Sequence, residues 1–267
     1  MRNKFMNKWA GMVAAKRPIY VNPIFPESGK GTLDGKTAVV IGGGGGIGAA
    51  ISRELKDAGC RVIVCGRRPY DMPGMESEIW DVSKTEEIAS KVSELIEKYE
   101  KIDIVVNSQG ICPDPDFTQS FYKVDIEDFE NVFKTNLESV YFICQEICRY
   151  FEANNIKGHI LNICSTEGMR GNKVPYGLTK TALIAFTKGL GKEMARKGIV
   201  INGIAPGATA TEMMRKDENG DVRSNWHPTK RMTVPAEIGK AALFLIQDTG
   251  NQMVGQVLVV DGGESMC

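Results

Sequence analysis

The stretch AVVIGGGGGIGAA, residues 38–50, holds five consecutive glycines and a sixth two positions later. An apolar, β-branched run over 37–41 precedes the glycines, and Ile47, Ile51 and Leu55 come after them at helical spacing. The glycines therefore lie at a turn from a strand to a helix. Bare backbone lets such a turn tighten and lets its N–H groups approach a pyrophosphate, beside the positive end of the helix dipole. This context favours a dinucleotide site over a flexible hinge or a plain packing turn.

Strand-like and helix-like runs alternate along the rest of the chain. The predicted strands cover 37–41, 61–65, 77–80, 102–106, 158–163, 199–204 and 256–260. The predicted helices cover 46–58, 84–99, 125–153, 176–197 and 235–247. We expect an α/β fold with a Rossmann-type doubly wound parallel sheet of about seven strands and helices on both faces, as a single domain over 35–267.

Composition excludes several classes of function. The 33 basic and 33 acidic side chains of the 267 residues cancel, so nothing global indicates a nucleic-acid partner. No apolar run approaches the ~20 residues of a membrane span. Seven cysteines without CxxC spacing and only two histidines argue against a metal site or a disulfide framework, and a reducing, cytoplasmic location fits best.

The segment 1–34 differs from the rest of the chain. Apolar residues at helical spacing predict a short amphipathic helix, and three prolines then force an extended arm; the apolar residues are Phe5, Met6, Trp9, Met12 and Val13. Five basic residues and no acid precede Glu27, which allows a membrane-surface or targeting role. We favour the alternative that this helix packs on the main domain or on a neighbouring subunit.

Four motifs follow one another along the chain, at positions where strands end or helices begin. They are GxxxGxG at Gly42, Gly46 and Gly48; NSQG at 107–110; YGLTK at 176–180; and Pro206-Gly207. Together they resemble the short-chain dehydrogenase/reductase family, and the resemblance covers 35–267. It implies an NAD(P)-dependent oxidoreductase that interconverts a secondary alcohol and its ketone by hydride transfer, assembled as a homotetramer through its last helix and strand.

Three side chains are candidates for the chemistry. Tyr176 and Lys180 are four apart on a predicted helix and so share a face. A tyrosine with a pKa near ~10 exchanges protons poorly at neutral pH, and we expect the Lys180 ammonium to lower that pKa. Ser165 comes after a predicted strand, where its hydroxyl can bond the substrate oxygen; Thr166 is the fallback.

The resemblance assigns two asparagines. Asn136 corresponds to the asparagine that anchors a water in the proton path to the lysine, although a solvated helical asparagine is the alternative. Asn107 corresponds to a structural asparagine whose turn is NNAG in the family and NSQG here, so Ser108 and Gln109 depart from the pattern. Gly110 keeps the close backbone approach to the cofactor.

Cofactor choice depends on the end of the second strand. An acid there bonds the adenosine ribose in NAD-preferring folds, whereas arginine accommodates a 2′-phosphate. Arg67 and Arg68 stand there, with no acid before Asp71. NADP(H) is therefore favoured and NAD(H) stays possible, with a solvated arginine pair as the alternative.

The resemblance places nineteen residues against the cofactor. They are Gly42, Gly44, Gly45, Gly46, Ile47, Gly48, Arg67, Arg68, Asp81, Val82, Asn107, Ser108, Gly110, Tyr176, Lys180, Pro206, Gly207, Thr209 and Thr211. Three features depart from the family. The loop 166–175 is compact, Ile41 replaces a common threonine, and the link 67–80 leaves little room for a helix.

The substrate is the least determined feature. The polar segment 212–233 is typical of a lid, and Met169, Met213 and Met214 suit an apolar substrate, although they could equally be core or interface methionines. Polyols, hydroxysteroids or bile acids, and 3-oxoacyl thioesters all remain open. A non-catalytic NADP(H)-binding sensor or scaffold is the competing hypothesis, and it does not need Tyr176, Lys180 and a serine together.

Overall fold

The computed structural model describes residues 32–113, 121–216, 220–225 and 227–266. The predicted amphipathic helix and most of the predicted arm lie outside these residues. Within them, Leu33 is buried, and its N–H donates to the Ala58 carbonyl at the end of the first described helix (2.8 Å).

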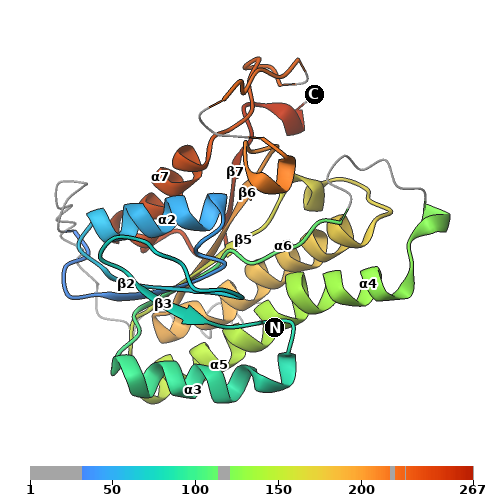
Figure 1. Cartoon of the computed structure of the whole chain (residues 1–267). Helices are drawn as coiled ribbons and strands as arrows, with labels where there is room; N and C mark the ends of the chain where they lie inside the picture. The colour runs from blue at the N-terminus through green and yellow to red at the C-terminus, as the bar shows by residue number, and fades with distance from the viewer. Residues whose placement is uncertain (1–31, 114–120, 217–219, 226, 267) are drawn as a thin grey trace, which may run out of the picture.

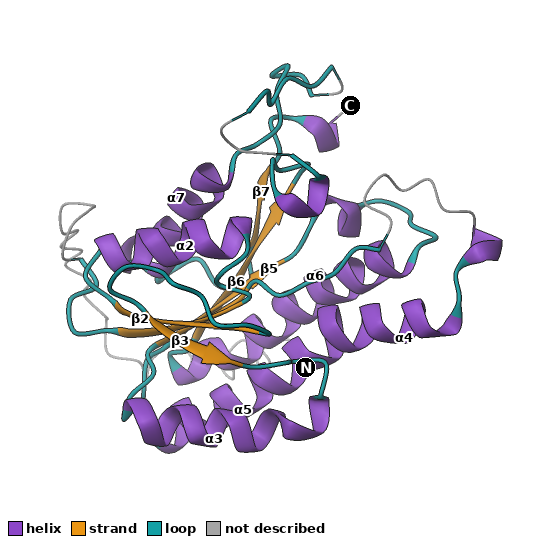
Figure 2. Cartoon of the chain, viewed as in Figure 1, coloured by secondary structure: helices purple, strands orange, loops and turns teal. Residues whose placement is uncertain are grey.

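One parallel sheet organises the described residues (Figures 1 and 2). Its strands are β1 (Thr37–Ile41), β2 (Arg61–Gly66), β3 (Glu76–Ile79), β4 (Ile104–Asn107), β5 (His159–Ile163), β6 (Val200–Pro206) and β7 (Val257–Val260). Their spatial order is β3-β2-β1-β4-β5-β6-β7. The order reverses direction at β1, next to β4, so the predicted doubly wound sheet is confirmed. In such sheets ligands bind outside the carboxyl ends of the strands near this reversal.

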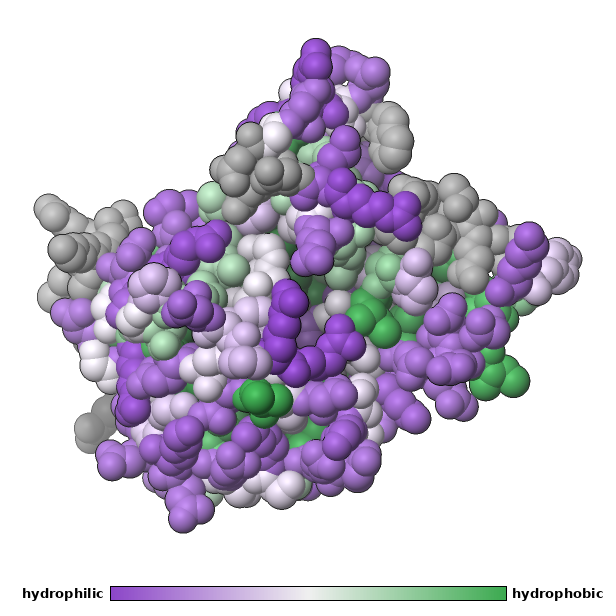
Figure 3. Space-filling model, viewed as in Figure 1, coloured by the Kyte–Doolittle hydropathy of each residue, from purple (hydrophilic) through white to green (hydrophobic). Residues whose placement is uncertain are grey.

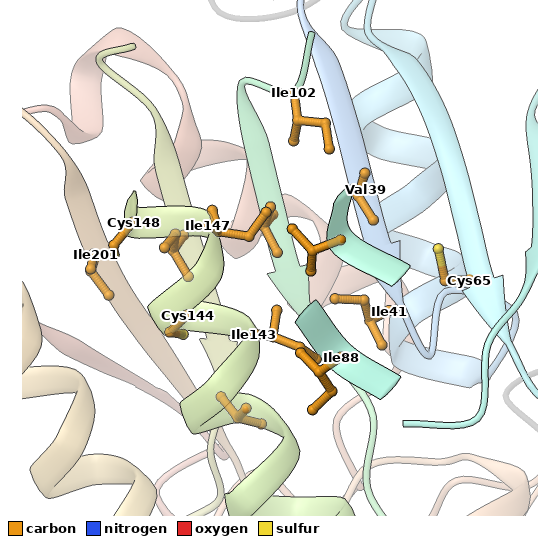
Figure 4. Packing of buried hydrophobic residues seen from close by; sticks show 14 of the residues in the cluster. Val39, Ile41, Cys65, Ile88, Ile102, Ile143, Cys144, Ile147, Cys148 and Ile201 are labelled. Atoms are coloured by element: carbon orange, nitrogen blue, oxygen red, sulfur yellow. The ribbon is translucent and has the colours of Figure 1, made fainter. Parts of the chain in front are cut away.

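Helices cover both faces of the sheet (Figure 1). The helices are α2 (Gly46–Asp57), α3 (Ile88–Tyr99), α4 (Ile126–Phe133), α5 (Ser139–Ala153), α6 (Pro175–Met194) and α7 (Pro235–Ile246). Alternate residues of β1 point to opposite faces of the sheet, so each face has its own layer of helices. Ala38 and Val40 pack with α2 and α7 on one face. Val39 and Ile41 pack with α3 and α5 on the other. Figure 4 shows the second cluster, with Ile143 and Ile147 of α5 facing the strands.

Three of the predicted helices include a turn that is not α-helical, and in the stretch 176–197 this is the 3-10 turn Ala195–Lys197 after α6. The stretch 125–153 is interrupted by a π-helical turn, Lys134–Glu138, between α4 and α5. The stretch 84–99 begins with a 3-10 turn, Thr85–Glu87, before α3. The link between β2 and β3 contains no helix, as its two prolines and a glycine predicted.

The face of the molecule seen in Figure 3 is mostly polar, with apolar side chains exposed over α4. Ile126 is 78% exposed and Phe129 is 41% exposed. None of the described helices combines the length and the apolar character that crossing a membrane requires.

Candidate active site

The glycine turn is held by contacts that only glycine allows. A methyl group at Gly48 would lie 2.1 Å from the Gly42 carbonyl oxygen, and one at Gly42 would lie 2.8 Å from the Gln109 nitrogen. Gly42 also has a φ of +73°, in the left-handed region. These contacts seat the start of α2 against the end of β4.

The N-terminus of α2 is open to an anion. Gly45 is the N-cap and has no side chain, so within the described residues no N-cap side chain accepts from the first-turn N–H groups of α2. Thr211 lies against the turn, because a methyl at Gly46 would be 2.7 Å from its Cγ2. The bare turn, the uncapped helix dipole and the nearby hydroxyl fit a pyrophosphate.

Tyr176 and Lys180 lie in the first two turns of α6, which begins with Pro175 at a position that suits proline. Lys180 is 3% exposed. Its Nζ donates to the Ile163 carbonyl at the end of β5 (2.8 Å) and lies 5.6 Å from the centre of the Tyr176 ring. The spacing of four residues therefore places both groups at the carboxyl end of β5.

Ser165 joins this pair from the loop after β5. Its Oγ accepts from the Glu167 N–H (3.2 Å), so Ser165 caps the start of the 3-10 turn Thr166–Met169. Ser165 is also hydrogen-bonded to the Tyr176 side chain. Thr166, the fallback for the serine role, is 2% exposed and lies in that turn.

The pKa of Tyr176 differs from the expected direction. Desolvation raises the pKa of Tyr176 above its usual range, and the bond with Ser165 opposes this only in part. Burial lowers the pKa of Lys180 from 10.5 to about 8. The expectation that the ammonium lowers the Tyr176 pKa is therefore wrong for this structure, because desolvation dominates and Lys180 directs a donor to Ile163.

Asn136 lies in the π-helical turn and is fully buried, so the solvated alternative is wrong. Its Oδ1 accepts from the Ile111 N–H (2.8 Å), and its Nδ2 donates to the Ile111 carbonyl (2.9 Å). A methyl at Gly110 would lie 3.5 Å from Asn136 Oδ1 and 3.7 Å from Lys180 Nζ. Asn136 and Lys180 thus flank Gly110, at the end of the segment that comes after β4.

The NSQG segment connects the strands beneath this group. Asn107 donates to Asn162 Oδ1 of β5 (2.9 Å), and Asn162 donates to Thr187 of α6 (3.0 Å). Gln109, which replaces the family's alanine, is buried and donates to Ser139 Oγ (3.2 Å). Ser108 is partly exposed beside Gly42.

Most of the remaining predicted cofactor residues lie at or directly after the ends of β2, β3 and β6, and Ile47 lies in the first turn of α2. Arg67 and Arg68 are exposed directly after β2. The Asp81 carboxylate accepts from the Ser83 N–H and hydroxyl (3.1 and 2.8 Å). The others are Val82 (buried), Ile47 (partly buried), Pro206, which ends β6, Gly207, and Thr209, which donates to the Gly207 carbonyl. All of them stand near the carboxyl edge of the sheet.

The loops beyond this edge contain contacts that sequence analysis missed. Glu264 near the C-terminus accepts from Arg170 (3.1 Å) and from the Ala208 N–H (3.2 Å), so it ties the loop after β5 to the loop after β6. Tyr70 lies against the glycine turn. Neither residue belongs to a periodic or motif signal. Met169 and Met213 are 50% and 41% exposed, which excludes a core role for them.

Comparison with known proteins finds relatives along most of the chain. The family described as "Enoyl-(Acyl carrier protein) reductase" matches residues 42–265. The chain is 35% identical to the 3-oxoacyl-[acyl-carrier-protein] reductase of Chlamydia trachomatis, over 87% of this chain and 98% of that protein. It is 31% identical to an acetoacetyl-CoA reductase of Acinetobacter, over 85% and 97%.

A solved structure extends the likeness to three dimensions. It is the 3-ketoacyl-(acyl-carrier-protein) reductase of Brucella melitensis complexed with NADH, with a TM-score of 0.79 and 27% identity over 87% of this chain and 99% of that one. Motifs, sheet order and similarity along the chain agree. The chain belongs to the short-chain dehydrogenase/reductase family of oxidoreductases.

Proposed function

We propose that the chain reduces the ketone of a 3-oxoacyl thioester to a secondary alcohol, with NADPH as the favoured cofactor. The observation that carries this is the cluster at the carboxyl edge of the sheet. In this cluster Ser165 is hydrogen-bonded to Tyr176. Lys180 is buried beside them, and both Lys180 and Asn136 lie next to Gly110.

The cluster suits the reductive direction. When bound, NADPH supplies the hydride that reduces the carbonyl carbon. Ser165 orients the carbonyl oxygen by a hydrogen bond, and Tyr176 donates a proton to that oxygen as charge develops on it. Because desolvation raises the pKa of Tyr176, the phenol is protonated at neutral pH, and it gives up this proton only as negative charge develops on the substrate oxygen.

Lys180 and Asn136 support the return of the proton. A lysine whose burial brings its pKa to about 8 can gain or lose a proton near neutral pH. Asn136 positions the segment after β4 through its paired bonds with Ile111, and this segment is one wall of the lysine site. Lys180 would also hold the nicotinamide ribose.

The cofactor would lie along the edge from β2 to β6. The glycine turn and the N-terminus of α2 would hold the pyrophosphate. Arg67 and Arg68 would pair with the 2′-phosphate, since a guanidinium makes charge-assisted bonds to phosphate and no acid competes directly after β2.

Two observations favour a thioester over a sugar or steroid. The relatives named above are reductases of 3-oxoacyl-carrier and acetoacetyl-CoA substrates. Met169 and Met213 expose flexible thioethers on the loops after β5 and β6, where an acyl chain of variable length could pack.

The test is NADPH oxidation with a panel of acetoacetyl-CoA, an enoyl-CoA, simple ketones and aldoses. We expect acetoacetyl-CoA to give the highest kcat/KM, and NADPH to outperform NADH. Tyr176→Phe should lower kcat by at least about 100-fold, since a positioned proton donor contributes ~100- to 10,000-fold. Preferential turnover of the enoyl thioester would replace this proposal by enoyl reduction, and tight binding without any turnover would favour the sensor hypothesis.

A homotetramer and a cytoplasmic location remain part of this proposal. The last helix and strand expose Phe244 (44%) and Leu258 (37%), as a subunit interface would require. Sedimentation of the full chain would test the tetramer, and removal of residues 1–34 would show whether the arm contributes to it.

A further inference from the structure

The ring of Tyr70 lies between two glycines. A methyl at Gly44 would be 2.1 Å from the Cδ1 and Cε1 atoms of Tyr70, and a methyl at Gly66 would be 2.6 Å from its Cε2. The ring therefore contacts bare backbone on both sides. We call the space between Gly44 and Gly66 the Tyr70 seat.

The Tyr70 seat coincides with the adenosine end of a dinucleotide site. Gly44 belongs to the glycine turn, two residues before α2, and Gly66 is the last residue of β2. The two segments are in contact, since the Gly42 N–H donates to the Cys65 carbonyl (2.8 Å). In a doubly wound fold the pyrophosphate lies at the glycine turn and the adenosine ribose at the end of the second strand. The ribose must then pass through the space that Tyr70 fills.

Contacts on both sides hold the ring in place. The Tyr70 N–H donates to Ser77 Oγ of β3 (2.9 Å). The Arg68 guanidinium carbon lies 5.7 Å from the ring centre, within the range of a cation–π contact. Arg68 is one of the two candidates for the 2′-phosphate, so the same ring that fills the seat also engages a phosphate-binding cation.

The segment that carries Tyr70 can move without breaking a helix. Residues 67–75 form an irregular link, and Arg67, Arg68, Pro69 and Asp71 are exposed within it. Rotation of the ring out of the seat costs its contacts with Gly44 and Gly66 and its packing against the core cluster beside α2, and it frees Arg68.

We propose that Tyr70 is an affinity-determining residue of the cofactor site, which occupies the adenosine ribose position and must leave it before NADP(H) binds. This inference rests on the proposed cofactor. A protein whose competent form is only partly populated binds with an apparent Kd raised in proportion. Removing the ring should therefore tighten binding, which is the opposite of what a stacking partner would do.

The experiment measures NADPH binding by stopped-flow fluorescence in four variants and the wild type. We expect Tyr70→Ala to lower the Kd by at least about threefold through faster association. Tyr70→Phe keeps the ring and should stay within about twofold of wild type. Gly44→Ala places a methyl in the seat at a backbone conformation open to any residue, and should expel the ring. Tyr122→Ala, at a tyrosine that is 92% exposed, is the matched control and should change nothing.

A second readout observes the ring directly. In the fluorine NMR spectrum of protein labelled with 3-fluorotyrosine, the Tyr70 resonance is identified as the one that is missing from the spectrum of Tyr70→Phe. It should shift when NADPH is added to the wild type, and in free Gly44→Ala it should already be shifted.

The outcomes separate this inference from the proposed function. Faster and tighter binding of NADPH by Tyr70→Ala, together with the NADPH-induced shift of the Tyr70 fluorine resonance, supports the inference that Tyr70 must leave the seat. If the wild type binds NADPH and Tyr70→Ala binds it no more tightly, the inference about Tyr70 is overturned and the cofactor proposal still stands. A wild type that binds neither NADPH nor NADH overturns both.

Discussion

Replacing Lys180 with methionine is expected to stabilise the protein near neutral pH while removing activity. Lys180 is 3% exposed, and burial lowers its pKa from 10.5 to about 8. The difference between 10.5 and about 8, at ~1.4 kcal/mol per pKa unit, corresponds to a cost of about 3 kcal/mol for the folded ammonium below pH 8. Losing the bond to the Ile163 carbonyl removes about 1 kcal/mol. The net gain should be about 2 kcal/mol at neutral pH.

The pH dependence has a definite sign. Between about pH 8 and pH 10.5 the unfolded chain keeps a proton on Lys180 that the folded chain has lost, so wild-type stability rises with pH relative to the variant. The advantage of Lys180→Met should therefore shrink to less than about 0.5 kcal/mol near pH 9.5.

Urea unfolding at about pH 7 and about pH 9.5 measures this difference. Lys188→Met, at an exposed lysine of the same helix, is the control and should match the wild type at both pH values. A variant less stable than the wild type at neutral pH, or a stability difference that does not change with pH, would refute the reasoning.

Three further predictions rest on individual contacts. Gly48→Ala puts a methyl 2.1 Å from the Gly42 carbonyl oxygen and should lower the free energy of unfolding by about 3 kcal/mol; an unchanged Tm would contradict it. Burial alone would raise the pKa of Asp103, but bonds from Lys101 and a backbone N–H lower it below 3.8. The stabilisation that the Asp103 carboxylate provides should be lost as the pH falls through that lowered pKa, so the free energy of unfolding of Asp103→Asn should fall less steeply in acid than that of the wild type. Parallel plots of that free energy against pH for the two proteins would argue against this. Arg68→Ala should reduce the NADPH-to-NADH ratio of kcat/KM by about tenfold, whereas an equal loss with both cofactors would point to a structural role.

Much of the fold could be predicted from local patterns. Strands buried on both faces have continuous apolar sequences, and the glycines mark the turn where β1 meets α2. The absence of a helix between β2 and β3 was predictable from Pro69, Pro73 and Gly74. The π-helical turn at Asn136 could not be predicted, because its amide bonds to Ile111, a residue 25 positions earlier in the chain.

The site was predictable only where a motif specifies it. Tyr176, Lys180 and Ser165 lie together as their spacing and strand ends implied. The direction of the Tyr176 pKa was missed, because it depends on desolvation by the folded protein, which no local pattern encodes. Tyr70 was missed for the same reason, since its contacts join the turn after β1 to the end of β2 through space.

The most direct test of the proposed chemistry is transfer of deuterium from NADPH that carries deuterium at both C4 positions, [4,4-²H2]NADPH, to acetoacetyl-CoA. The wild type should yield 3-hydroxybutyryl-CoA with deuterium at C3, and Tyr176→Phe should yield at most about 1% as much in the same time. Deuterated product formed equally fast by Tyr176→Phe, or no deuterated product from the wild type under conditions where it binds NADPH, would contradict the assignment of this site as a ketone reductase.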